Sequence, residues 1–249
     1  MNIISFIKRV PATTAKVVVA DQKLDPTGVE FVLNPYDEFA VEEALQQKEK
    51  AGEGSVTVIS LGATEAQKEV RTALAMGADA GVLLTNPAAP DADGATTARV
   101  LAAATEGRDF DLLLFGKQAV DRDQHGVGPA VATRLGIPCI TEVVKLEITD
   151  GKVLAEREVE GAREVIEAPL PCAVTCQKGL NEPRFASLKG IMQAKKKPLE
   201  TLEAELGTAA VEVVSMDMPP ARPAGRIVGE GAAAVPELIR ALREESKVL

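Results

Sequence analysis

Aromatic residues and histidine are scarce in this chain of 249 residues, which has no Trp, one Tyr, six Phe and a single His. Because 46% of the residues are hydrophobic, a large core is possible, and Val, Leu, Ile and Ala must supply most of it. The one histidine, His125, argues against a zinc site, and neither Ser nor Cys stands at a spacing that makes a nucleophilic pair with it. These scarcities predict no metal site and no catalytic residues, and they favour binding over catalysis.

Cysteine is nearly as rare, with Cys139, Cys172 and Cys176 as its only representatives. An odd number of cysteines without a secretory signal indicates a reducing compartment, so we expect a cytoplasmic protein. The spacing Cys172-x-x-x-Cys176 differs from that of a thioredoxin-like pair. We expect all three cysteines to be structural thiols, because free cysteine is commonly buried.

Long apolar runs are missing as well. No run approaches the roughly 20 residues that cross a bilayer, so we expect no direct membrane insertion. Residues 1–10 place their charge after the apolar part and lack a cleavage-like end, which favours a buried first strand over a signal peptide.

Positive charge is in deficit, because 28 Lys and Arg residues face 37 Asp and Glu residues and the formal net charge is −9. This balance argues against general nucleic-acid binding, which requires a basic surface. One basic segment, 195–197, lies near Arg184 and Lys189 in the sequence. A solvated positive face explains that segment as well as a binding surface does.

Strand and helix patterns alternate up to about residue 136, and the change from one period to the other predicts βαβ units and a parallel sheet covered by helices. We predict an α/β, Rossmann-like fold in which the C-terminal ends of the strands share one edge, where ligands bind. The expected strands are 2–8, 55–61, 81–84 and 111–115, and the expected helices are 37–51, 64–76, 95–106 and 129–135.

The pattern changes after residue 137. Added strands are expected over 141–148, 152–159, 164–167 and 172–176, with Asp150-Gly151 as a turn signal, and short helices over 191–197 and 233–246. We therefore predict a nucleotide-binding domain over 1–190 and a C-terminal arm over 191–249. Physical reasoning alone leaves open whether the arm packs on another chain or on its own.

The most informative segment is the glycine-punctuated loop 116–128, between an apolar strand and a helix. Backbone N–H groups and a helix N-terminus at such a loop hold phosphate groups. The loop is neither a Walker A motif nor a dinucleotide fingerprint. Residues 34–37 join this edge only if the long connection over 11–33 folds back. Lys117, Gln118 and Arg122 could hold a phosphate there without hydrolysing it.

Five segments, in order, resemble the β subunit of electron transfer flavoprotein. They are Lys8-Arg9-Val10, residues 34–44 (NPYDEFAVEEA), residues 71–79 (RTALAMGAD), residues 116–121 (GKQAVD) and residues 180–186 (LNEPRFA). The resemblance extends over nearly the whole chain, and five motifs together are far more specific than any one of them.

This resemblance implies a fold of the adenine nucleotide alpha hydrolase type and a heterodimer. The α subunit would carry most of the FAD site, the β chain would hold a structural AMP, and the arm would pack on the α subunit. Electrons would arrive from flavin dehydrogenases such as acyl-CoA dehydrogenase, in fatty acid β-oxidation, and leave toward a membrane quinone oxidoreductase. The chain itself would turn over no substrate.

The resemblance also implies particular site residues. Tyr36 would approach the dimethylbenzene edge of the flavin, unless it is only a core aromatic at a helix start. The implied AMP site comprises Phe6, Asn34, Pro35, Tyr36, Asp37, Leu61, Gly116, Lys117, Gln118, Ala119, Val120, Asp121, Arg122, Asp123, Gln124, His125, Gly126 and Val127.

Segment 180–197 resembles the family's recognition loop. Leu188, an apolar residue on a polar loop, would insert into a pocket of a dehydrogenase, although it could instead pack on Ile191 as a helix staple. Arg157 is expected in an internal or inter-subunit ion pair. The residues expected to bind partners are Leu188, Glu158, Asn181, Glu182, Pro183 and Arg184.

Three other functions compete with this one. A bifurcating relative would hold a second FAD in place of AMP and oxidise NADH. A stand-alone ATP- or AMP-binding regulatory module, like a universal stress protein, would be self-contained within about 140–160 residues. An ATP-dependent enzyme of the same fold group would need a pyrophosphate-binding motif near the first strand, which Pro11-Ala12-Thr13-Thr14 does not supply.

Overall fold

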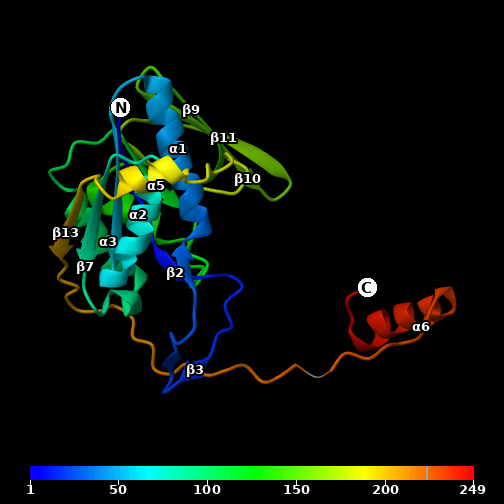
Figure 1. Cartoon of the computed structure of the whole chain (residues 1–249). Helices are drawn as coiled ribbons and strands as arrows, with labels where there is room; N and C mark the ends of the chain where they lie inside the picture. The colour runs from blue at the N-terminus through cyan, green and yellow to red at the C-terminus, as the bar shows by residue number, and fades with distance from the viewer. Residues whose placement is uncertain (223) are drawn as a thin grey trace. The chain divides into compact units, whose positions relative to one another are not determined.

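The computed structural model (Figure 1) describes residues 1–222 and 224–249, which form two compact units. The first comprises Met1–Val17 and Asp25–Val214, and the second comprises Val18–Leu24 and Ser215–Leu249.

A nine-stranded sheet forms the first unit, in the order β11-β10-β9-β12-β8-β1-β6-β7-β13. All neighbouring pairs from β9 to β13 in this order are parallel, while β9, β10 and β11 pair antiparallel. The parallel α/β class predicted from the sequence is therefore confirmed. The parallel core strands are β1 (Asn2–Phe6), β6 (Ser55–Gly62), β7 (Ala80–Thr85), β8 (Leu112–Gly116) and β12 (Cys172–Cys176).

Helices cover both faces of the sheet. Helices α1 (Pro35–Ala51) and α2 (Gln67–Met76) bury Val41 and Leu74 in one core cluster. Helices α3 (Gly94–Thr105) and α4 (Val127–Leu135) bury Leu101 and Val131 in the other. Short 3-10 turns, η1 (Thr64–Ala66) and η2 (Ala89–Asp91), precede α2 and α3. All four expected helices are present, within a few residues of their predicted ends.

The connection after β1 folds back. Strands β2 (Arg9–Pro11) and β5 (Phe31–Leu33) pair antiparallel, with Arg9 opposite Leu33. The backbone N–H of Asn34 then donates to the carbonyl of Lys8 at 2.9 Å. Residues 34–37 thus reach the edge of the sheet where ligands are expected to bind. The sequence analysis had expected this only if the connection over 11–33 folds back.

The added strands after α4 are also present: β9 (Cys139–Thr149), β10 (Lys152–Val159) and β11 (Ala162–Pro169). Asp150 and Gly151 both have positive φ, 51° and 74°, as the turn signal requires. Arg157 donates to Glu164 at 2.6 Å, so its ion pair is internal. The three cysteines are free thiols, and Cys172 and Cys176 are fully buried.

Strand β13 (Leu199–Glu203) corrects the expected domain boundary. It pairs parallel with β7, with Leu199 opposite Gly81, so residues 191–214 belong to the first unit rather than to the arm. Helix α5 (Leu188–Ala194) also starts earlier than predicted. The sequence missed β13 because an edge strand needs no continuous apolar run, and this one carries Glu200, Thr201 and Glu203.

The second unit contains the hairpin of β3 (Val19–Ala20) and β4 (Lys23–Leu24) and the helical segment near the C-terminus. That segment runs through η3 (Ala232–Ala234), α6 (Val235–Arg240) and the π-helical turn η4 (Ala241–Glu245), in agreement with the predicted helix. Val235, Leu238 and Ile239 are exposed on it. Across residues 1–222 and 224–249, no helix combines the length and apolar character needed to span a membrane.

Candidate functional site

A cleft lies at the C-terminal ends of β1, β6 and β8, where open parallel sheets bind ligands. About 850 Å³ of space not filled by atoms lies within the cleft and at its mouth, and part of that space is open solvent. Its lining residues are Phe6, Ile7, Lys8, Asp37, Leu61, Ala89, Pro90, Ala92, Gly94, Thr97, Leu101, Phe115, Gly116, Lys117, Gln118, Ala119, Arg122, Gln124, His125, Gly126, Val127 and Gly128.

One part of the cleft lining is apolar. The rings of Phe6 and Phe115 stack with their centroids 4.3 Å apart and an angle of 7° between their planes. Leu61 and Leu101 complete this apolar part of the lining. Such a surface suits a flat heterocycle, whose faces are poorly hydrated.

The polar part of the lining comes from the N-terminal ends of α3 and α4, at Gly94 and at Gly126 to Gly128. Free N–H groups at helix N-termini carry partial positive charge and bind phosphate. Gly128 must be small, because a Cβ there would lie 2.8 Å from Thr175 and 3.2 Å from Phe115. Because Gly128 has no side chain, the start of helix α4 packs directly against the sheet.

Asp37 joins the ends of two strands beneath the cleft. Its carboxylate accepts hydrogen bonds from the backbone N–H groups of Lys8 at 2.7 Å and Gly116 at 3.2 Å. Burial raises the pKa of Asp37 to about 7 in spite of these bonds and of one with Asn34. Gly116 leaves the room that this contact needs, since a Cβ there would lie 2.3 Å from the Asp37 carboxylate.

Asn34 is fully buried and holds the loop rather than facing the cleft. Its amide donates to the carbonyl of Gln118 at 2.8 Å and accepts from the N–H of Val120 at 3.2 Å. Asn34 was among the residues expected to bind AMP, but a hydrogen bond from its side chain to a nucleotide would require this amide to leave the loop. We therefore assign Asn34 to positioning the loop.

The charged side chains of the loop are largely bound within the protein. Arg122 donates to the carbonyls of Ala92 and Pro90, both at 2.8 Å, and Lys8 pairs with Asp121 at 2.6 Å. The ammonium group of Lys117 lies 5.3 Å from the centroid of the Tyr36 ring. Glu142, an acceptor that the sequence did not indicate, lies 3.9 Å from Lys117 and 3.6 Å from His125. Arg122 keeps its charge, because its partners are neutral carbonyls, so it adds to the positive charge of the cleft lining beside the backbone N–H groups.

The structure brings together most of the predicted AMP-site residues. Those that do not line the cleft are Asn34, Pro35, Tyr36, Val120, Asp121 and Asp123; Asp123 instead accepts a bond from Gln118. Sequence reasoning missed Gly94 and Thr97, although Asp93 caps that helix by accepting from Thr96 at 2.7 Å, a readable helix-start signal. The sequence pattern did not indicate that segment 89–92 lines the cleft. Arg122, about 30 positions away in the chain, holds this segment at the cleft through the carbonyls of Pro90 and Ala92.

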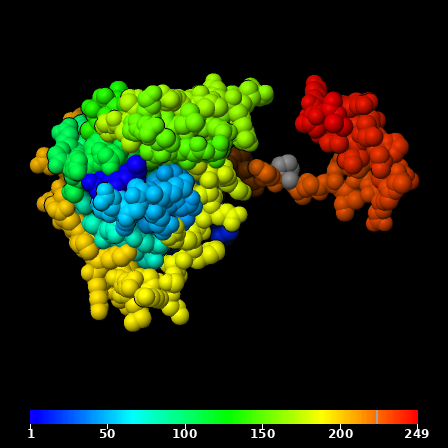
Figure 2. Space-filling model, turned by 90° about the horizontal axis from the view of Figure 1, so that it is seen from above, coloured from blue at the N-terminus to red at the C-terminus, as the bar shows by residue number. Residues whose placement is uncertain are grey.

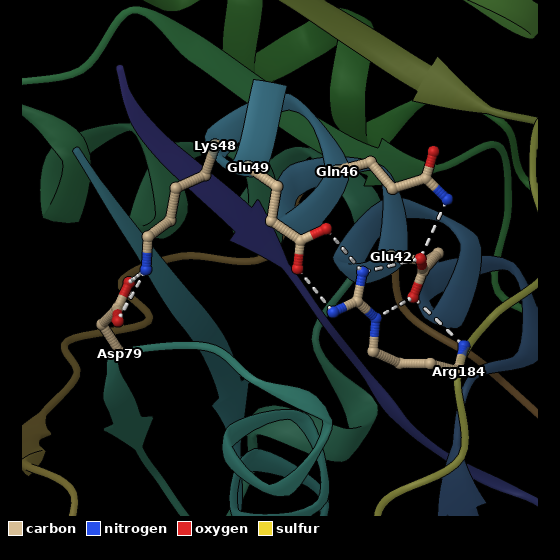
Figure 3. Close-up of polar contacts among 6 residues, drawn as sticks. All are labelled: Glu42, Gln46, Lys48, Glu49, Asp79 and Arg184. Atoms are coloured by element: carbon tan, nitrogen blue, oxygen red, sulfur yellow. Dashed lines mark hydrogen bonds and ion pairs between the residues drawn. The ribbon is translucent and has the colours of Figure 1, made fainter. Parts of the chain in front are cut away.

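The segment expected to bind partners is held against α1 (Figure 3). Asn181 donates to Glu43 at 2.9 Å, and Arg184 binds Glu42 and Glu49. Pro183 is half-buried and Glu182 is exposed. Glu158, on the distant strand β10, is exposed and pairs with Arg163 at 3.1 Å.

Leu188 is the first residue of α5 and is 83% exposed, so little of its side chain is buried against Ile191 or any other residue. Phe185, which the sequence analysis did not single out, is 98% exposed, and Met192 is 70% exposed. We call Phe185, Leu188 and Met192 the apolar step. Large exposed apolar residues grouped in this way mark interaction sites.

Comparison with known proteins decides the family. A family profile described as "Electron transfer flavoprotein domain" matches residues 22–206. The chain is 43% identical to the electron transfer flavoprotein subunit beta of Bacillus subtilis, over 100% of both chains. The chain belongs to the electron transfer flavoprotein family. It is also similar to the beta subunits of Mus musculus (40% identical, 88% of this chain and 89% of the relative) and Homo sapiens (38%, 90% and 91%).

Membership among electron transfer flavoprotein beta subunits confirms the resemblance read from the five motifs. It gives the chain a role in electron transfer, involves a flavin and implies an alpha subunit as partner.

Proposed function

We propose that this chain holds one AMP in the cleft and, with its alpha subunit, encloses an FAD that the alpha subunit holds for the most part. In this role it accepts electrons from flavin dehydrogenases such as acyl-CoA dehydrogenase, for passage to a membrane quinone oxidoreductase. The single observation that carries the proposal is the cleft itself, with stacked Phe6 and Phe115 and the N-termini of α3 and α4 in its lining.

The residues present suit AMP. The apolar part of the lining fits an adenine ring, and the helix N-termini fit one phosphate group. The described residues contain no cluster of three or more His, Cys, Asp or Glu side chains that could hold a metal ion. Lys8 and Arg122 are already bound within the protein, which suits holding a nucleotide better than cleaving it.

Tyr36 is the residue we assign to the flavin. It follows Asn34 and Pro35 at the start of α1 and lies outside the lining of the AMP cleft. Tyr36 is half-buried, and the Lys117 ammonium group lies over its ring. Part of the side chain is therefore accessible to a ligand, unlike that of a fully buried core residue. The bound flavin would supply one-electron and two-electron redox chemistry, while Tyr36 would shield its dimethylbenzene edge.

Dehydrogenase docking is assigned to the apolar step and to the exposed residues near it. Leu188 would enter an apolar pocket of the dehydrogenase, as central anchor residues do at other interfaces. Lys189, Lys195 and Lys196 are exposed beside it and would favour an acidic rim on the partner. Glu158 is the further contact that the family resemblance suggests.

The helical segment of the second unit is assigned to the alpha subunit. Val235, Leu238 and Ile239 are between 38% and 48% exposed, so an amphipathic surface lacks a partner within the described residues. Amphipathic helices of this kind pack against another chain.

Released cofactors provide the test. The chain is co-expressed and purified with its alpha subunit, the complex is denatured, and the nucleotides are quantified by chromatography and mass spectrometry. One FAD and one AMP per heterodimer are expected. Two FAD molecules and no AMP per heterodimer would contradict the proposal and indicate a bifurcating relative. ATP bound to a homodimer without an alpha subunit would also contradict it and indicate a nucleotide-sensing module.

A further inference from the structure

Segment 181–197, which carries the apolar step, is fixed to helix α1 near its first end by Arg184. The guanidinium group donates from Nε to Glu42 at 2.8 Å and from Nη1 to Glu49 at 2.7 Å, while Nη2 donates to both carboxylates at 3.0 and 3.2 Å. Figure 3 shows this fork, with both glutamates on α1. Its partners lie 135 and 142 positions away in the sequence, so the contact is tertiary.

Electrostatics make this fork strong. The Glu42 side chain is only 4% exposed, and the backbone N–H of Arg184 also donates to it, at 3.1 Å. Burial raises the pKa of Glu42, but hydrogen bonds from Arg184 and Gln46 more than offset that, and the pKa lies below its ordinary value. Hydrogen bonds to Glu49 and Glu42 also raise the pKa of Arg184. Removing Arg184 would leave the buried carboxylate of Glu42 without its cationic partner.

A second arginine fixes the other end of the segment to α2. Arg71 donates to the carbonyls of Ala194 at 2.6 Å and Lys197 at 2.9 Å. The ammonium group of Lys197 in turn donates to the carbonyls of Leu74 and Ala78 at the end of α2. The apolar step therefore lies between two anchored ends.

The side chains of the apolar step contribute little to holding it in place, and α5, which carries Leu188 and Met192, is held by packing against α2. Phe185 and Leu188 are 98% and 83% exposed, so burial of their side chains cannot fix their position. Arg184 directly precedes Phe185, and its backbone and side chain both bind Glu42. In Figure 2, the yellow atoms of this part of the chain lie beside the pale-blue atoms of α1 and project from that face.

We propose that Arg184 is a positioning residue for electron transfer: its fork on Glu42 and Glu49 holds the apolar step in the orientation that a dehydrogenase binds. The inference rests on the docking role proposed for that step. Without the fork, Phe185 and the residues before α5 would lose their attachment to α1, and each docking event would have to order them first. Arg184 itself need not touch the dehydrogenase.

Substitutions at Arg184 test the inference in the heterodimer. Arg184→Gln removes the charge and the fork, and Arg184→Lys keeps the charge but cannot span two carboxylates. The matched control is Lys48→Gln, which breaks the ion pair between Lys48 on the same helix and Asp79 and leaves the Arg184 fork intact (Figure 3). Hydrogen–deuterium exchange reports the order of residues 181–192. Stopped-flow reduction of the flavin by substrate-reduced acyl-CoA dehydrogenase reports docking.

We expect exchange over 181–192 to become at least tenfold faster in Arg184→Gln, with nucleotide content unchanged. The dehydrogenase concentration that gives half-maximal rate should rise about tenfold, and less in Arg184→Lys, while the limiting rate stays near the original value. Lys48→Gln should change neither quantity. Faster exchange with unchanged docking would make the fork merely structural and overturn the inference, as would unchanged exchange.

The proposed docking role fails in a distinguishable way. If Leu188→Ala leaves docking unchanged, the apolar step is not the docking surface, whatever Arg184 does. If Leu188→Ala weakens docking and Arg184→Gln does not, the docking role stands and the positioning inference falls.

Discussion

The carboxylate of Asp37 accepts a hydrogen bond from the backbone N–H of Gly116 at 3.2 Å, joining residues 79 positions apart in the chain. The same carboxylate holds the N–H of Lys8 at 2.7 Å. The start of α1 is thereby tied to the ends of β1 and β8, the two strands beneath the cleft. This buried side chain therefore helps to fix the shape of the cleft.

Gly116→Ala should disrupt the site. An alanine Cβ would lie 2.3 Å from the Asp37 carboxylate and 2.7 Å from the carbonyl carbon of Tyr36, so the backbone must move. We expect a loss of about 1–3 kcal/mol in the free energy of unfolding and loss of bound nucleotide. Urea unfolding and nucleotide content measure the two effects. For stability, Gly126→Ala is the matched control, since its Cβ would meet only the carbonyl of Gln124, at 3.5 Å. Equal stability of the two variants would refute this account.

The pH dependence of stability should carry a contribution from Asp37. Burial raises its pKa from 3.8 to about 7, so between these values the folded chain keeps a proton that the unfolded chain has released. Stability from this group is therefore fully present below pH 3.8 and is lost as the pH rises toward 7, by up to about 1.4 kcal/mol per pH unit.

Asp37→Asn does not titrate and should lose that contribution. The measurement is urea unfolding of the nucleotide-free chain from pH 4 to 8, followed by far-UV circular dichroism. Nucleotide must be absent, because a phosphate also titrates near pH 6. The difference between wild type and variant should change over pH 4–7 and become flat above it. A difference that is constant across the whole range would contradict the raised pKa.

Much of this site follows from the sequence, and the missing parts have physical causes. Apolar runs and glycine stops located β1, β6 and β8, and the loop after β8 was visible because polar residues and glycines interrupt the pattern. The role of Asn34 was not readable, because a short-range pattern cannot say whether an amide faces a ligand or a loop 84 positions away. Likewise, nothing near Arg184 in the sequence indicates Glu42 or Glu49.

Leu188→Ala should weaken dehydrogenase docking without affecting the nucleotide. Leu188 is 83% exposed, so its truncation costs the fold little, while an anchor residue contributes much of the binding energy at an interface. We expect the half-saturating dehydrogenase concentration to rise about tenfold, which corresponds to about 1.4 kcal/mol. Stopped-flow flavin reduction measures it. Val213→Ala, which truncates a side chain 62% exposed elsewhere, is the control. Equal effects of the two substitutions would rule out a specific docking anchor.

Ending the chain after Val214 should separate nucleotide binding from association with the alpha subunit. The first compact unit ends at that residue and contains β13, which covers the edge of β7 by parallel pairing. The truncated chain should therefore fold and bind AMP, yet fail to elute with the alpha subunit in size-exclusion chromatography, because the amphipathic helical segment is gone. A second variant, which ends after Pro198, provides the contrast. This shorter chain lacks β13, so the edge of β7 is exposed, and we expect a lower melting temperature or aggregation. If the chain ending at Val214 still bound the alpha subunit, the partner surface would lie on the first unit, and the arm would have another role.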